Sequence, residues 1–255
     1  MRVWSSFAVL LFAFLPGVAW AQPAPSDQPA PQIKMDFAVG KRMAEDLDKK
    51  EGRIDDQEII TFLQGIQNRL ATATNTTPME IRLTPRTELY ATLLPNRVLY
   101  LSAGMAARAD NEGEIAGLLA HELAHAEAGW PPVPQGQVRV WNPCVLGRYA
   151  MPGGFREHEQ EATRAAIAYL KAAQYDPAAV LDLLSKISYE HPLWGRSIVA
   201  DDLLDLRVQV EAEAPPDAGY RLDSSQFARI HKKLVAALPH GSGLIGMGSA
   251  ASAAP

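Results

Sequence analysis

The sequence predicts an α+β fold that is mostly helical and contains one small antiparallel sheet. Apolar residues recur at helical spacing in the first third of the chain and again from Glu112 onward. Between these regions lie short β-branched and alternating runs separated by turn residues, a pattern typical of strands. With 255 residues, the chain is long enough to bury one substantial hydrophobic core.

The N-terminal segment predicts export. A basic residue, an apolar run from Val3 to Leu15 and a small-residue site ending at Ala21 have the layout of a cleaved signal peptide. We therefore expect residues 1–21 to be a signal peptide and residues 22–34, rich in Pro, Ala and Gln, to be a disordered leader. The expected location is the periplasm or, with further secretion, the medium. No later stretch is apolar for long enough to predict a membrane-spanning segment.

One domain over residues 35–238 is expected after the leader, followed by a disordered Gly, Ser and Ala-rich tail over 239–255. Its first helices are expected from Phe37 to Leu47 and from Asp55 to Leu70, the second starting at an Asp cap. The expected strands, with a turn at Pro95-Asn96 between the last two, are Met79 to Leu83, Leu89 to Leu94 and Val98 to Leu101. An exposed edge strand of this sheet could pair with an extended peptide. A hairpin that only covers the core helix is equally compatible with these residues.

The next predicted helix, from Glu112 to Gly129, has clear boundaries. Asn111 and Glu114 form a capping-box pair at its start, and a glycine followed by Trp130 and two prolines ends it. Its apolar stripe indicates that the helix packs in the core.

This helix contains the sequence HELAH over residues 121–125. His121 and His125 lie one turn apart on the same face, so their imidazoles can bind one ion. Glu122 can reach a water on that ion and act as the general base of a hydrolysis. A buried helix with two hydrogen-bonded histidines is the alternative interpretation. Two histidines at this spacing, with a glutamate beside the first, favour the metal site.

A third ligand is expected on the helix that begins at Arg156, after a long Pro and Gly-rich segment. A catalytic zinc site needs a third protein ligand and one open position. Helical spacing places Glu157 and Glu161 on one face and directs Glu159 elsewhere. Geometry alone therefore leaves Glu157, His158 and Glu161 as candidates.

At this point the two motifs resemble peptidase family M forty-eight, which includes periplasmic BepA-like zinc metallopeptidases. That family has HExxH on one helix and an R-x-x-E-x-E-A-D segment on a later one, matched here by Arg156, Glu159, Glu161 and Ala162. The likeness continues over residues 90–104, 174–177, 191–196 and 223–234, and this chain shows no evident repeat domain. The resemblance implies a gluzincin-like metallopeptidase domain that binds one zinc ion per chain, with Glu161 as the third ligand.

The chain departs from the family pattern at two places that matter. Thr163 stands where the family has an Asp that orients a ligand histidine, and such outer partners typically change metal affinity or activity 10- to 100-fold. Asn96 and Arg97 replace two glycines at the turn before the last strand.

The expected mechanism uses Glu122 as the base, while His191 or Arg196 donates a hydrogen bond to the developing oxyanion. In a closed, latent state His191 could instead be a fourth zinc ligand. Cys144 is the only cysteine, so an internal disulfide is excluded, and we expect it to be an inert buried thiol.

Taken together, these residues predict a zinc-dependent endopeptidase of the cell envelope that acts on polypeptides, including misfolded envelope proteins. The family resemblance supplies the role in protein quality control. The alternative is a zinc-containing, chaperone-like binding protein with little or no proteolysis, and hydrolysis of a non-peptide amide also stays open. A net charge of −5 without a basic cluster argues against a nucleic-acid partner. The sequence makes no prediction about the oligomeric state.

Overall fold

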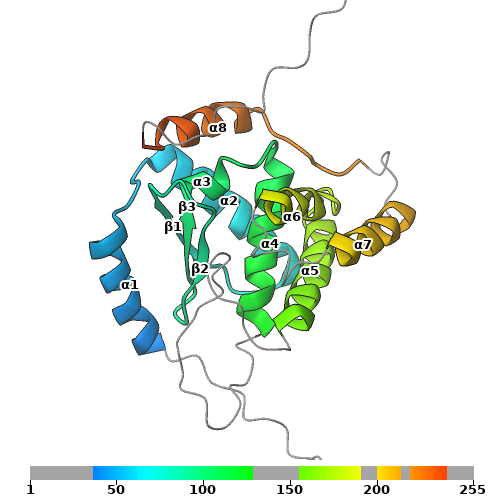
Figure 1. The fold of residues 1–255 in the computed structure, drawn as a ribbon, viewed down its shortest axis with the longest axis horizontal. Coiled ribbons are helices and arrows are strands. Elements are labelled where there is room, and N and C mark those ends of the chain that lie inside the picture. Colours follow the sequence, from blue (N-terminus) through cyan, green and yellow to red (C-terminus); the bar gives the residue numbers. More distant parts are fainter. Residues whose placement is uncertain (1–36, 129–154, 191–199, 214–218, 240–255) are drawn as a thin grey trace, which may run out of the picture. The chain divides into compact units, whose positions relative to one another are not determined.

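Helices precede, flank and follow a three-stranded sheet (Figure 1). The computed structural model describes residues 37–128, 155–190, 200–213 and 219–239, which all belong to one compact unit over Gln32–Pro255. In chain order the elements are α1 (Phe37–Glu51), α2 (Gln57–Thr74), β1 (Glu80–Thr84), β2 (Ala91–Leu93), β3 (Val98–Ser102), α3 (Ala103–Ala106), α4 (Glu112–Ala128), α5 (Phe155–Ala172), α6 (Ala179–Glu190), α7 (Ala200–Glu213) and α8 (Phe227–Ala236). The predicted α+β class is confirmed. The signal peptide, the leader and the tail beyond Pro239 lie outside the described residues.

The sheet is mixed, which corrects the prediction of a wholly antiparallel sheet. Its strand order is β1-β3-β2. The predicted hairpin is present, since β2 runs antiparallel to β3 with Ala91 opposite Leu101. β1 instead lies on the other side of β3 and runs parallel to it, with Glu80 opposite Val98. β1 and β2 are therefore the two edges of the described sheet.

The two faces of β3 contact different helices. Val98 and Tyr100 form a small apolar cluster with Ala44 of α1, whereas Leu99 and Leu101 belong to the main core. This alternation follows from the two-residue period of a strand. The Tyr100 hydroxyl also donates to the Ala44 carbonyl, at 2.8 Å, so a hydrogen bond as well as apolar contact holds α1 against the sheet.

Helix α4 lies in the middle of the core and packs against α2, α5 and α6 (Figure 1). All its residues from Glu112 to Ala126 are buried. The predicted cap is present, because the Asn111 side-chain oxygen accepts from the Glu114 amide at 2.9 Å. The Glu114 carboxylate accepts from the Asp110 amide, one residue earlier than a capping box requires.

Close packing of α4 on α6 depends on a glycine. A Cβ added at Gly117 would lie 2.7 Å from the Cα of Val180, so any larger residue would push the two helices apart. Among the described residues, no helix is both long and apolar enough to cross a membrane.

Candidate metal centre

Three buried side chains from two helices converge on one point. His121 and His125 come from α4 and Glu159 comes from α5, and one ligand atom of each lies within 4.8 Å of the others. The His121 Nε2 atom is 3.0 Å from His125 Nε2 and 3.1 Å from Glu159 Oε2. His125 Nε2 lies 3.5 Å from the other carboxylate oxygen of Glu159.

These separations fit a zinc ion. Zinc bonds to histidine nitrogen and carboxylate oxygen are about 2.0 to 2.2 Å long, so the ligand atoms of a tetrahedral site lie roughly 3.3 Å apart. The two separations from His121 Nε2, 3.0 and 3.1 Å, are slightly shorter than that value, and the 3.5 Å separation is measured to the other carboxylate oxygen of Glu159. Two imidazoles and one carboxylate are also a ligand set that leaves a fourth position open. The group could therefore hold a metal ion.

The third member of the group differs from the one expected, because the structure places Glu159 in it and leaves Glu161 on the surface. Glu159 is 3% exposed, whereas Glu161 and Glu157 are both exposed. This arrangement does not agree with the expectation that Glu161 is the third ligand. It also does not agree with the expectation that Glu159 points elsewhere.

The rotation of α5 follows from its apolar residues. Its buried residues recur every four positions, as Ala162, Ala166 and Leu170. One turn before Ala162 along the same face lies Glu159. Glu161 is offset from that face and points to solvent. The signal for Glu159 was thus present in the sequence, in the residues that follow the motif rather than in the motif itself.

Thr163 supports His121 from the side away from the ligand group. The Thr163 hydroxyl donates to the Glu159 carbonyl at 2.8 Å. The Thr163 Oγ1 atom can therefore accept a hydrogen bond from His121 Nδ1, which lies 3.4 Å away. This arrangement places the proton of a neutral His121 on Nδ1 and leaves the Nε2 lone pair facing the Glu159 carboxylate. In this tautomer both atoms, which are 3.1 Å apart, can bind a metal ion.

His158 contacts the other ligand histidine. Its Nε2 atom lies 3.2 Å from His125 Nδ1, on the opposite side of the ring from the ligand group. Burial and then the nearby His125 lower the pKa of His158, so this imidazole is neutral at pH 7 and can accept a hydrogen bond. His158, one of the three ligand candidates, is therefore an outer contact of His125 and not a member of the group.

Electrostatics favour the charge states that metal ligands need. Burial lowers the pKa of His125, which keeps the imidazole neutral. Burial alone would raise the pKa of Glu159, but its interactions with His125 and His121 outweigh burial and hold that pKa below its usual range. A neutral imidazole and an ionised carboxylate are the forms that bind metal.

Glu122 is fully buried beside this group, and neither of its carboxylate oxygens is hydrogen-bonded to another described residue. Burial, and then the negative charge of Glu159, raise the pKa of Glu122 well above its usual value. Both features are costly for folding and are typical of a group kept for chemistry.

Arg97 also contributes, although the sequence suggested only a departure from the family pattern. It adopts a left-handed conformation with φ of 61° at the β2–β3 turn. Its guanidinium pairs with Glu127 at 2.8 Å and donates to the Thr77 carbonyl. The hairpin is thereby fixed to the C-terminal end of α4, a contact that two glycines could not make.

The structure does not describe the other expected site residues. His191, Arg196 and Cys144 lie in segments outside the described residues, so their predicted roles stay predictions.

Searches against models of protein families and against curated proteins found no match for this chain.

Proposed function

We propose that this protein is a zinc-dependent endopeptidase of the cell envelope. The observation that carries the proposal is the position of Glu122, a buried carboxylate with two unpartnered oxygens directly beside a His-His-Glu ligand group. A binding protein that used zinc only for structure would gain nothing from such a group, whereas a hydrolase requires one. The signal-like segment over residues 1–21 supports the location.

His121, His125 and Glu159 would hold the ion. Zinc bound by three protein ligands supplies a water of lowered pKa and polarises the scissile carbonyl. Glu122 takes the proton from the attacking water and passes it to the leaving amine. The raised pKa of Glu122 makes it a stronger proton acceptor than an ordinary glutamate.

The outer edge of the hairpin is covered. β2 pairs only with β3 in the described sheet, but its residues are at most 1% exposed, so this edge is not open to pairing with an extended chain.

The proposal can be tested with labelled casein and the zinc-loaded full chain. We expect hydrolysis that a zinc chelator stops and added zinc restores. Glu122→Gln should keep its zinc and its melting temperature but lose activity by about 10²- to 10⁴-fold, the usual contribution of a general base. Cleavage by Glu122→Gln at the wild-type rate would contradict the role of Glu122. Absence of chelator-sensitive cleavage of casein and of short peptides, with casein still bound, would instead support the chaperone-like alternative.

A further inference from the structure

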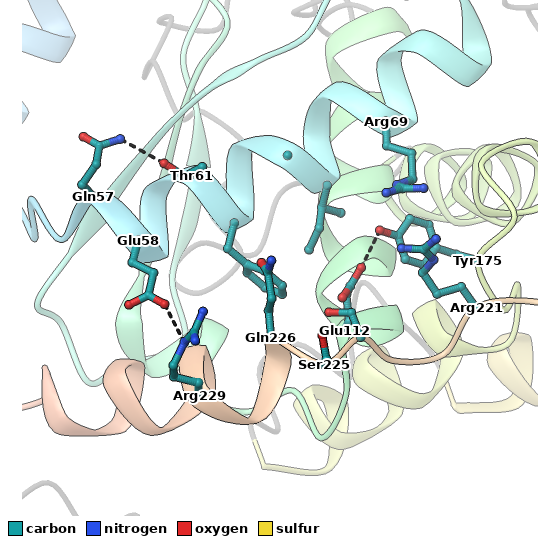
Figure 2. A pocket seen from close by; sticks show the side chains of 14 residues that line it. Gln57, Glu58, Thr61, Arg69, Glu112, Tyr175, Arg221, Ser225, Gln226 and Arg229 are labelled. Carbon is teal, nitrogen blue, oxygen red and sulfur yellow. Dashed lines mark hydrogen bonds and ion pairs between the residues drawn. The ribbon is translucent and has the colours of Figure 1, made fainter.

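A cavity of about 670 Å³ lies near the first residue of α4 (Figure 2). Residues of α2, α4, the α5–α6 connection and the segment leading into α8 line it. Its size is within the range of small-molecule sites. Glu112 lines this cavity and precedes His121 by nine residues, or roughly 13 Å of helix at 1.5 Å per residue. The cavity is therefore separate from the metal centre.

Two guanidinium groups in this pocket have no carboxylate partner within the described part of the chain. The Cζ atoms of Arg69 and Arg221 each lie 5.9 Å from the centre of the Tyr175 ring, and neither arginine forms an ion pair there. Arg229 lines the same pocket but pairs with Glu58 at 2.6 Å. Free guanidinium groups are suited to carboxylate or phosphate oxygens, which they can bind through two hydrogen bonds.

A buried acceptor lies beside these arginines. Glu112 is only 3% exposed, and its Oε1 atom accepts from the Tyr175 hydroxyl at 2.7 Å. Its Oε2 atom has no hydrogen-bond partner among the residues that the structure describes. Figure 2 shows the Glu112 carboxylate directed toward Tyr175, with Arg69 and Arg221 around that ring. A buried acceptor of this kind usually receives a hydrogen bond, and a ligand in this cavity can supply the donor.

The start of α8 adds further contacts for an anion. Ser224, Ser225 and Gln226 line the pocket just before this helix. Gln226 is at the N-cap position, but its side chain makes no cap hydrogen bond. The first amides of a helix favour negative charge when no side chain caps them.

We propose that this pocket binds a phosphate group that retains one proton. The charged oxygens bind to Arg69 and Arg221, and the protonated oxygen donates to Oε2 of Glu112. The Glu112 carboxylate can only accept a hydrogen bond. An oxyanion without a proton, such as sulfate, would therefore place a negative oxygen against Oε2. Inorganic phosphate and small phosphomonoesters share the required chemistry. The proposal is independent of peptidase activity.

Calorimetric titration of the zinc-loaded chain near pH 6.5 tests it, with inorganic phosphate, sulfate and glycerol phosphate as probes. We expect phosphate to bind at least about tenfold more tightly than sulfate, because sulfate would leave the buried Glu112 oxygen facing another negative charge. Arg69→Gln with Arg221→Gln should weaken phosphate binding by a similar factor. Glu112→Gln should remove the preference for phosphate over sulfate. Arg164→Gln, an exposed arginine of α5 outside this pocket, is the matched control and should change neither affinity.

Three results would overturn the proposal: no phosphate binding, equal affinity for phosphate and sulfate, or unchanged phosphate binding in the double arginine variant. The last result, combined with loss of phosphate binding after zinc removal, would place the phosphate on the metal. Both arginines are exposed, so the double variant should fold even if Glu112→Gln does not. Glycerol phosphate binding equal to that of phosphate would identify phosphomonoesters as ligands, and weaker binding would identify free phosphate.

Discussion

The two helices that supply the candidate ligands face the core in different ways. α4 is buried on every side from Glu112 to Ala126, whereas α5 has one buried and one exposed face. On α4 the spacing of the histidines was enough to place them, because every direction from this helix leads into the protein. On α5 the same kind of reasoning failed, because only the rotation of the helix decides which acidic residue lies inside. A ligand motif on an amphipathic helix must therefore be interpreted together with its apolar face.

The largest expected effect is on α5, where two glutamates of one segment should behave oppositely. Glu159→Ala removes a ligand and should weaken zinc binding by more than the 10- to 100-fold typical of an outer partner. Glu161→Ala removes an exposed carboxylate and should leave zinc binding unchanged. Zinc content after dialysis, measured by mass spectrometry, compares the two variants. Equal losses in both would mean that the helix has no distinct ligand face.

The burial of α4 can be tested through its glycine. Gly117→Ala forces a Cβ to within 2.7 Å of Val180 and should lower the free energy of unfolding by about 1–3 kcal/mol. Gly65 is the matched control, because it lies on α2, which like α5 has an exposed face, and an added Cβ there meets nothing within 4 Å. Gly65→Ala should stabilise the protein by about 0.5–1 kcal/mol. Urea denaturation measures both, and a loss of stability at Gly65 would remove the contrast.

Thr163 tests how α5 supports α4. Thr163→Asp should tighten zinc binding roughly tenfold, because a carboxylate accepts from His121 Nδ1 more strongly than a hydroxyl does. Thr163→Val keeps the shape, removes the acceptor and should weaken binding by a similar factor. Chelator competition gives both affinities. If neither changes, the contact between Thr163 and His121 does not orient the ligand.

His158 should give the smallest effect. His158→Leu removes the contact to His125 Nδ1 and should weaken zinc binding about three- to tenfold, at the low end of outer-partner effects. His158→Gln still offers an acceptor and should restore most of the loss. The exposed neighbour Glu157→Gln is the control. The visible spectrum of the cobalt-substituted protein should shift in the Leu variant only. Identical spectra and affinities for Leu and Gln would assign His158 a packing role.

Much of the fold followed from local signals in the sequence. The Asp cap at the start of α2 is Asp56, and the β2–β3 turn and the start of α4 lie where turn and cap chemistry predicted them. The parallel pairing of β1 could not be predicted, because strand order depends on how α2 packs against the sheet and not on the residues of β1. Thr163 was expected to lie near a ligand histidine by resemblance, and the structure confirms that contact with His121. Arg97 could not be predicted, because its partner Glu127 is thirty residues away and comes close only through the tertiary fold.

The most direct test of the metal centre is zinc-edge anomalous diffraction from crystals of the zinc-loaded protein. We expect one strong peak at bonding distance, about 2.0 to 2.2 Å, from His121 Nε2, His125 Nε2 and a carboxylate oxygen of Glu159. A peak bonded to Glu161, or the absence of any peak between the two histidines, would contradict the site described above.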